Sequence, residues 1–269
     1  NDWTFLEKMF VHNKLSEHQI LIINQTEKGI ELHSTEPHIR VINSFEKGLS
    51  KSRNVALQNA TGDICLIADD DVVFEPDFIN GISKGFQQFK DADVVSFKTK
   101  TTKGNAYWAY PDEDGPMPSS KIRKILSVEL AFRRRNILEK KVWFNEYFGL
   151  GAEFPNGANY LFLKDLTKKS AKICFYRSFI CTHPPVSSSD QVGTDALLYA
   201  ITGRNCYLYG KWAYVLLLKF VFYIWRKFYI DFTQIPHKLK VGYAGIKKFY
   251  SLKEKIQHFE PANHSLSQN

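Results

Sequence analysis

Three consecutive carboxylates, Asp69, Asp70 and Asp71, follow a short apolar run at residues 64–68 (ICLIA). The apolar run predicts a strand, so the carboxylates lie where that strand ends. Carboxylates crowded in this way repel one another and need a compensating cation, and oxygen ligands favour a hard divalent ion such as Mg²⁺ or Mn²⁺. A metal ion held by carboxylates can in turn hold a diphosphate. The pattern therefore points to nucleotide-diphosphate chemistry.

The segments before the aspartates have the composition of elements that could position them. Residues 49–60 (LSKSRNVALQNA) have helical spacing and contain Arg53 and Asn54, and a Thr-Gly-Asp turn leads from them into the strand. An acidic run on its own is more often a solvated turn. Here the flanking strand and the helix with its Arg-Asn pair favour metal and nucleotide binding.

The first hundred residues alternate apolar strands with amphipathic helices, which predicts βαβ units and a parallel sheet. In such sheets ligands bind at the carboxyl ends of strands, and the aspartates lie at one of those ends. Residues 19–24 (QILIIN) are almost continuously apolar, so we expect a strand buried on both faces. Further strands are expected at 39–43 and 93–99, and helices at 3–11 and 77–89.

The periodicity weakens after residue 100. Residues 103–120 and 144–157 are rich in Gly, Pro and aromatic residues, and both are predicted to be loops, with an ordered stretch at 127–135 between them. The later pattern predicts a helix at 158–169, a strand at 172–181 that leads to His183, and helices at 192–206 and 210–230.

The whole net charge of +8 lies in residues 203–269, which hold 11 Lys and Arg against 3 Asp and Glu. Because the first 202 residues carry no excess charge, the composition gives no argument for a nucleic-acid partner. The four cysteines show no CxxC spacing, which predicts a reducing compartment and no zinc site.

The tail is also unusually apolar and aromatic between residues 212 and 230. Its longest uncharged run, Trp212–Leu218, is far shorter than the ~20 residues that span a bilayer. Two interpretations stay open: a helix that packs on the core, or a basic amphipathic helix at a membrane surface, with peripheral contact through residues 206–230.

Several motifs follow one another along the chain: GLSKSRN, ATGD, an apolar strand, DDD and VVFEPDF, then AFRR at 131–134 and FNEYFGLGAEFPNG at 144–157. This order resembles glycosyltransferase family 2 of the bacterial surface-polysaccharide type. The resemblance covers roughly residues 5–185. It implies an α/β, Rossmann-like GT-A fold with a DxD motif, here with a C-terminal helical extension. The implied parts are a nucleotide-sugar-binding part at 1–102, an acceptor-side part at 103–190 and a basic, aromatic helical tail at 191–269.

The resemblance also implies roles for single residues. Asp69 and Asp71 would be the outer carboxylates of the DxD motif and, with His183, would hold Mg²⁺ or Mn²⁺. For each residue outside the aspartates a structural role is the alternative: a satisfied histidine, a surface ion pair or a backbone hydrogen bond. The set that would bind the donor is Gln25, Arg53, Asn54, Asp69 and Asp70. The run Arg133–Arg135 is either an exposed basic face or a contact for a phosphate-bearing acceptor.

Three positions depart from the family pattern. Family members begin with an apolar strand, whereas this sequence begins at Asn1-Asp2-Trp3. Two alternatives stay open: the strand is absent, which would leave its neighbours unpaired, or the sequence is a fragment that does not include it. The next strand, which in the family ends in an acidic pair that reads the base, ends here in Asn24-Gln25. The slot of the general base reads Gly157-Ala158-Asn159, and neither Ala158 nor Asn159 takes a proton at neutral pH. Glu153 is the nearest carboxylate in that loop.

The activity that the resemblance implies is transfer of a sugar from a nucleotide-diphosphate donor to the hydroxyl of a saccharide or lipid-linked acceptor, with inversion at the anomeric carbon. The metal would neutralise charge on the departing diphosphate, and a carboxylate would deprotonate the acceptor. The expected location is the cytoplasm, at the inner face of the membrane. Two alternatives stay open: a degenerate member that binds a donor or a partner with little transfer, and a membrane-associated scaffold that is not an enzyme.

Overall fold

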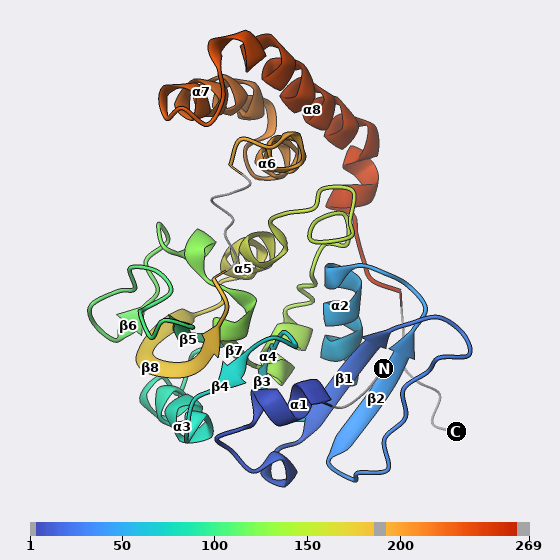
Figure 1. Ribbon diagram of the computed structural model, residues 1–269, viewed down its shortest axis with the longest axis vertical. Helices are drawn as coiled ribbons and strands as arrows, with labels where there is room; N and C mark the ends of the chain where they lie inside the picture. Colours follow the sequence, from blue (N-terminus) through green and yellow to red (C-terminus); the bar gives the residue numbers. More distant parts are fainter. Residues whose placement is uncertain (1–3, 186–191, 263–269) are drawn as a thin grey trace.

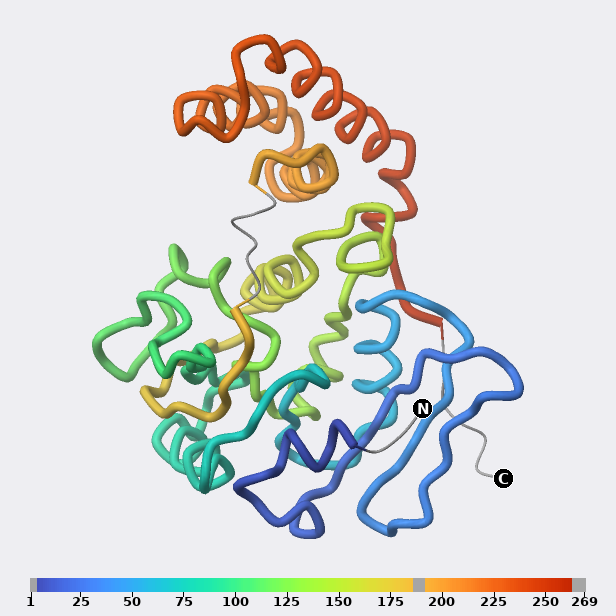
Figure 2. The backbone as a smooth tube through the Cα atoms, viewed as in Figure 1, coloured from blue at the N-terminus to red at the C-terminus, as the bar shows by residue number. Residues whose placement is uncertain are grey.

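Two adjacent valines at the start of β5 (Val94–Thr101) show how the central sheet is built. Val94 packs in one buried cluster and Val95 in another, because successive side chains of a strand point to opposite faces. The sheet is therefore covered on both sides. The computed structural model describes residues 4–185 and 192–262, and Figures 1 and 2 show an α/β part with a group of helices above it.

The central sheet is mixed, whereas the alternation of strands and helices predicted a parallel one. Its strand order is β3-β7-β5-β8-β4, with β6 paired to β8. β5 and β8 are parallel, and β7 runs antiparallel to both β3 and β5. It follows that β3, β5 and β8 run in the same direction and end at the same edge. The other bounds are β3 Ile64–Leu66, β4 Val73–Phe74, β6 Gly115–Pro116, β7 Leu130–Arg133 and β8 Ile173–His183.

The two N-terminal strands form a separate parallel sheet. β1 (Ile20–Gln25) pairs with β2 (Ile39–Ser44), and within the described residues neither strand pairs with the central sheet. β1 and β3 thus each have one strand neighbour there. The expectation that β1 is buried on both faces was wrong, because every residue of this strand is half-exposed. An apolar strand with a single neighbour leaves part of its surface uncovered.

Helices cover both faces of the central sheet. On one face, α1 (Thr4–Met9) and α3 (Phe78–Gln88) enclose a cluster that includes Phe74 and Phe97. On the other, α4 (Arg134–Glu139) and α5 (Ala158–Lys168) pack against Phe132 and Phe175, and Leu57 of α2 (Leu49–Asn59) joins them. Short 3₁₀ turns lie at Leu15–Glu17, Ile122–Lys124 and Ser127–Glu129.

The C-terminal helices have a core of their own. α6 (Asp195–Tyr209), α7 (Ala213–Arg226) and α8 (Ile235–Gln257) surround a cluster of buried apolar side chains, joined by short 3₁₀ turns at Gly210–Trp212 and Phe232–Gln234. Phe148 and Phe154 of the preceding loop insert into this cluster and tie it to the α/β part. The boundaries expected from the sequence, at residues 102 and 190, stay predictions.

Within the helical tail expected at 191–269, no single helix was predicted at the position of α8, although this helix has 23 residues. Its buried residues include Gly242, Ile246, Phe249 and Ile256, at successive spacings of four, three and seven residues, which are typical of one helix face. Two glycines on the same face bring it close to its neighbours: a Cβ at Gly242 would lie 2.2 Å from Leu217 Cδ1, and one at Gly245 would lie 2.6 Å from the carbonyl oxygen of Tyr199. The helices therefore pack at a separation that only glycine allows.

We expect Gly245→Val to lower the free energy of unfolding by roughly 2–3 kcal/mol, because the backbone of α6 cannot move aside for the new side chain. Ala244→Val is the matched control, since Ala244 is the exposed neighbour on the same helix and the same β-branched residue is introduced. Chemical denaturation of both variants measures the difference. Equal stability of the two variants would contradict the close packing of α6 and α8.

Candidate active site

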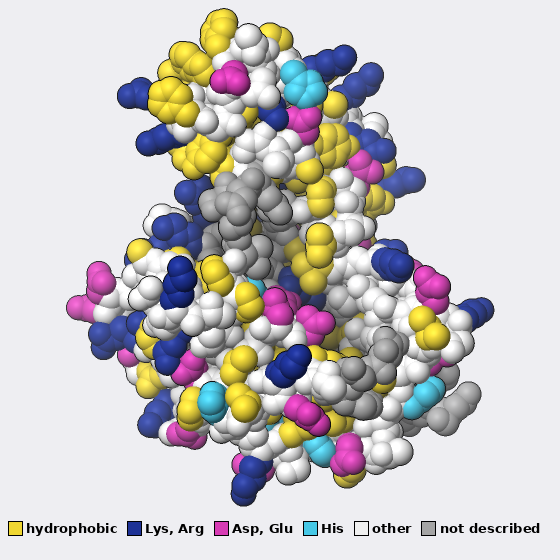
Figure 3. Space-filling view, in the orientation of Figure 1, with side chains coloured by type: hydrophobic (Ala, Val, Ile, Leu, Met, Phe, Trp, Pro, Cys, Tyr) yellow, Lys and Arg dark blue, Asp and Glu magenta, His cyan; other side chains and the backbone are white. Residues whose placement is uncertain are grey.

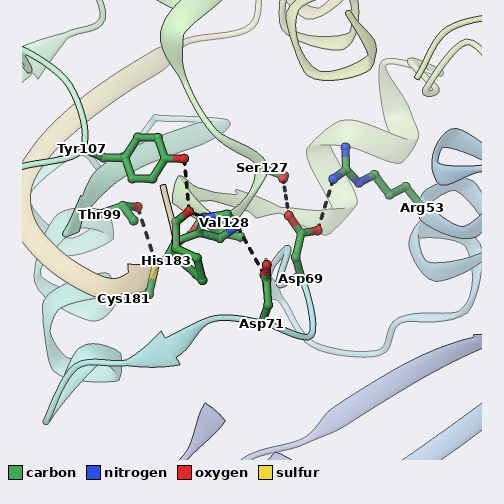
Figure 4. A network of polar contacts seen from close by, with 10 residues as sticks. Arg53, Asp69, Asp71, Thr99, Tyr107, Ser127, Val128, Cys181 and His183 are labelled. Atoms are coloured by element: carbon green, nitrogen blue, oxygen red, sulfur yellow. Dashed lines mark hydrogen bonds and ion pairs between the residues drawn. The ribbon is translucent and has the colours of Figure 1, made fainter. Parts of the chain in front are cut away.

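Two strand ends bring Asp71 and His183 together. The aspartates follow β3 and His183 ends β8, and these strands run in the same direction. His183 Nε2 lies 3.3 Å from Asp71 Oδ1 (Figure 4). Half of the Asp71 side chain is exposed, whereas His183 is buried. The pair is therefore open to solvent on the side of Asp71.

The ring of His183 is oriented by its own backbone. Nδ1 lies 2.6 Å from the carbonyl oxygen of Pro184, and because a carbonyl oxygen only accepts, Nδ1 carries the hydrogen. Tyr107 donates its hydroxyl to the same oxygen at 3.3 Å, and its ring packs edge-on against His183. In the neutral imidazole, Nε2 then presents a lone pair to the carboxylate of Asp71. Two hydrogen-bond acceptors at this distance repel each other unless a cation, either a proton or a metal ion, lies between them.

Asp69 is neutralised by the protein. Arg53 Nη2 lies 3.4 Å from Asp69 Oδ1, and Ser127 donates its hydroxyl to Asp69 Oδ2 at 3.0 Å. Arg53 is buried, with its guanidinium over the ring of Phe144, and it also donates to Asn159 Oδ1. Burial lowers the pKa of Arg53 and Asp69 opposes that change, so the guanidinium keeps its charge.

Asp70 has a different environment from its neighbours. It is exposed, and among the described residues its carboxylate has no ion-pair or hydrogen-bond partner. The three aspartates therefore take three states: Asp69 bound to protein donors, Asp70 in solvent and Asp71 facing a histidine. Within the described chain, no group of three or more His, Cys, Asp and Glu side chains is arranged to hold a metal ion. The structure brings Asp71 and His183 together and turns Asp69 towards Arg53 and Ser127, and metal binding by these three residues stays a prediction.

Two residues expected to bind a donor use their side-chain amides in hydrogen bonds within the chain. Asn54 is fully buried; it donates to the carbonyl of Phe144 and to Glu146, and it accepts from the amide of Phe144. Gln25 donates to the carbonyls of Glu46 and Gly48, at the start of α2. Both residues fix loops around the site, and direct contact with a donor stays a prediction for both.

The slot of the general base holds an amide. Asn159 is the second residue of α5, and its oxygen accepts from Arg53. Glu153, the nearest carboxylate of the loop, is bound elsewhere: Tyr199 of α6 donates to it, and Lys248 of α8 lies 3.5 Å from it. These contacts connect Glu153 with the C-terminal helices, and its role as a base stays a prediction.

The arginine run has structural partners. Arg133 donates to the carbonyls of Phe86 and Lys90, and Arg134 donates to Leu57 and Gln58 at the end of α2. Arg135 pairs with Glu139 on the same helix. The first two side chains therefore cap and join neighbouring segments.

Sequence reasoning missed Glu129, a fully buried carboxylate next to the site. Tyr110 donates its hydroxyl to it, Trp108 donates its indole N–H at 3.1 Å, and the amide of Leu126 donates at 3.0 Å. These bonds hold the loop at 103–120 against the segment that carries Ser127. The only signal in the sequence is an isolated glutamate within the apolar stretch SVELAF.

Burial raises the pKa of Glu129 to about 8, although the three donors oppose that rise. The ordinary value is 4.5, so between pH 4.5 and 8 the folded chain holds a proton here that the unfolded chain has lost. The stabilisation of the folded state by this proton on Glu129 is therefore complete below pH 4.5 and is lost as the pH rises towards 8.

We expect Glu129→Gln, which resembles the protonated acid, to remove this pH dependence. Between pH 5 and 8 the wild type should lose up to ~1.4 kcal/mol of stability per pH unit relative to the variant. Denaturation curves of both proteins across this range give the comparison. Parallel pH profiles would show that Glu129 does not hold its proton in the fold.

Comparison with known proteins gives a family match for part of the chain and the fold of the whole. Residues 22–148, which include Arg53 and the three aspartates, match the family model described as Glycosyl transferase family 2. No curated protein matches the sequence.

Among solved structures, S. aureus TarS has a TM-score of 0.52 and 17% identity over 82% of this chain, which spans 40% of that protein's length. TarS 1–349 in complex with UDP-GlcNAc gives 0.53 and 13% identity, covering 96% of this chain and 88% of the other. The complex with UDP gives 0.52 and 13%, covering 96% and 87%. At these identities the likeness shows the fold. Residues 22–148 are therefore similar to glycosyltransferase family 2, and the chain has an α/β GT-A fold with a helical C-terminal part.

Proposed function

We propose that this protein transfers a sugar from a nucleotide-diphosphate donor to an acceptor hydroxyl. The observation that carries the proposal is the pairing of Asp71 with His183 Nε2 beside the neutralised Asp69, inside a domain of this family. TarS, a protein of the same fold, has been solved with UDP-GlcNAc and with UDP. A nucleotide diphosphate is the class of donor that fits these facts.

Asp71 and His183 are the residues that would hold Mg²⁺ or Mn²⁺. Their chemistry fits such an ion, because a carboxylate oxygen and an imidazole lone pair face each other and Pro184 fixes the tautomer. Diphosphate oxygens and water would complete the coordination, since the chain itself supplies two ligands. When bound, the ion neutralises charge that develops on the departing diphosphate. Asp69 and Arg53 would then shape the adjoining wall of the donor site.

The reaction would invert the anomeric carbon: the acceptor oxygen forms the new bond as the bond to the diphosphate oxygen breaks. The acceptor proton needs a base, and Asn159 cannot supply one. Glu153 is the candidate from the loop. The second proposal, a degenerate member that binds a donor with little transfer, is favoured by this amide and by its bond to Arg53.

Binding of UDP with Mg²⁺ or Mn²⁺ should raise the melting temperature by roughly 5 °C at a ligand concentration 100 times Kd. Asp71→Asn should abolish this shift because it removes a charge from the metal site, whereas Asp63→Asn, an exposed aspartate before β3, should retain it. GDP, ADP and TDP belong in the same assay, because Gln25 does not define the base.

No shift with any nucleotide diphosphate would reject the donor site. A shift without sugar transfer, together with activity gained by Asn159→Asp, would favour the degenerate member. A shift without transfer in either protein would favour the scaffold.

We also propose a cytoplasmic protein that contacts the inner face of the membrane through residues 206–230. By length and composition Asp195–Arg226 could cross a membrane, but the backbone turns at Gly210 and divides this stretch into α6 and α7, of 15 and 14 residues. Each is shorter than the ~20 residues of a spanning helix. An orientation parallel to the surface fits these lengths better.

The surface of the C-terminal helices around α7 has the composition of a membrane-binding face. Eleven of the sixteen exposed large apolar side chains in the described residues lie between Tyr209 and Tyr243, and they include Trp212, Leu218 and Phe228. Figure 3 shows these side chains at the top of the molecule with basic groups beside them. Between residues 207 and 253 the sequence has nine Lys and Arg and a single acidic residue, Asp231. An anionic lipid surface matches both properties.

The double variant Leu218→Ser/Phe222→Ser should reduce binding to phosphatidylcholine–phosphatidylglycerol vesicles by at least ~10-fold, because two exposed apolar side chains are lost from one helix face. Leu150→Ser is the control, since Leu150 is exposed on the α/β part. Flotation with and without 0.5 M salt measures both contributions. Equal flotation of the two variants, or none of the wild type, would reject this face as the membrane contact.

A further inference from the structure

A polar cleft of about 540 Å³ lies beside α5, apart from the cluster of Asp69, Asp71 and His183. Three segments contribute to it: the 3₁₀ turn after the loop at 103–120, the exposed side of α5 and the end of α6. Its lining residues are Ser119, Ser120, Arg123, Tyr160, Lys164 and Tyr209. Every lining side chain carries a hydroxyl or a positive charge, and none is a carboxylate.

The cations of this cleft have no negative partner among the residues that the structure describes. Arg123 and Lys164 line the cleft, and Arg204 stacks over the ring of Tyr160 at 5.7 Å. Arg204 donates to Asn156, but its buried Nε has no hydrogen-bond partner. By contrast, Lys168 at the end of α5 forms an ion pair with Asp165 of the same helix.

The positive groups are close enough to affect one another. Burial lowers the pKa of Arg204, and the charge of Arg123 lowers it further. Burial also raises the pKa of Tyr160 to about 12, while Arg204 and Arg123 act in the opposite direction. Cations held together without carboxylates repel one another, and an anion placed between them removes that repulsion.

The two tyrosines add a second kind of contact. Tyr160 and Lys164 lie on one face of α5 because they are four residues apart. The hydroxyl of Tyr160 is 3.5 Å from that of Tyr209, and the rings border the cleft next to two serines. Aromatic rings with hydroxyls at their edges suit the mixed apolar and polar faces of a sugar. The cleft therefore combines contacts for a saccharide with contacts for a negative charge.

The cleft shares two segments with the cluster of Asp69, Asp71 and His183. Asn159, which accepts from Arg53, directly precedes Tyr160 on α5. Ser127, which donates to Asp69, lies four residues after Arg123. Both sites are thus built on the same helix and on the same connecting segment.

We infer that this cleft is an acceptor subsite that binds an anionic sugar unit, carrying a phosphate or a carboxylate, through Arg123 and Lys164. The inference rests on the proposed sugar transfer and narrows its acceptor to a negatively charged saccharide. Arg123 and Lys164 meet the anion, Tyr160 and Tyr209 meet the sugar ring, and Arg204 supports them from behind.

Ligand-observed NMR titrations test the cleft without any transfer reaction. The probes are glucose 1-phosphate, glucuronic acid and methyl glucoside, each with saturating UDP and Mg²⁺ so that the donor site is filled. The wild type should bind at least one anionic probe about 10-fold more tightly than the neutral one, and the double variant Arg123→Gln/Lys164→Gln should lose that preference. Comparison of the phosphate and carboxylate probes identifies the favoured anion.

The matched control is Arg135→Gln/Lys168→Gln, which removes two paired cations elsewhere on the α/β part and should leave the preference unchanged. The shift in melting temperature with UDP should be equal in both double variants, because neither touches the aspartates. Equal binding of charged and neutral probes, or a preference that survives Arg123→Gln/Lys164→Gln, would overturn the subsite. Failure of UDP binding alone would instead count against the donor site.

Discussion

The charge of Asp69 is the constraint on which the site depends. Three carboxylates at one strand end repel one another, and the buried guanidinium of Arg53 removes one of them from the repulsion. Arg53 comes from α2, stacks on Phe144 and also binds Asn159 of α5, so a single side chain connects the aspartates with two helices and a loop. A buried charge with such partners is costly to disturb. The contact thus joins α2 and α5 to the segment that follows β3.

The same contact divides the aspartates between tasks. Because Arg53 and Ser127 satisfy Asp69, we propose Asp71 and His183 as the pair that holds a cation. This division gives the three adjacent carboxylates different partners. Asn159 also accepts from Arg53, so the guanidinium serves one carboxylate and one amide.

Much of the fold could be predicted from the sequence because its elements have strong local signals. The apolar strands β1, β3 and β5 and the helices α2, α3 and α5 were expected within a few residues of their bounds. The direction of β7 could not be predicted, because antiparallel pairing depends on contacts between distant segments. Two-residue β4 carries too little pattern, and α8 was hidden by glycines whose purpose is visible only beside α6 and α7.

The site was predictable to a similar degree. The aspartates were singled out by residue type and by their place after a strand, and Arg53 and His183 by the family resemblance. Their partners depend on side-chain geometry that no spacing encodes. Glu129 shows this clearly, since its donors Trp108 and Tyr110 come from a loop about twenty residues earlier in the chain. The positive cleft was missed for the same reason: Arg123, Lys164 and Arg204 are far apart in the sequence and appear unremarkable one by one.

Helix α5 also sets a distance. Asn159 and Lys164 are five residues apart, which is about 7.5 Å along the helix axis and puts their side chains on different sides of the helix. An acceptor bound in the cleft would have to pass around α5 to reach the aspartates. The helix would then select acceptors by the length between their negative group and their reacting hydroxyl as well as by their charge.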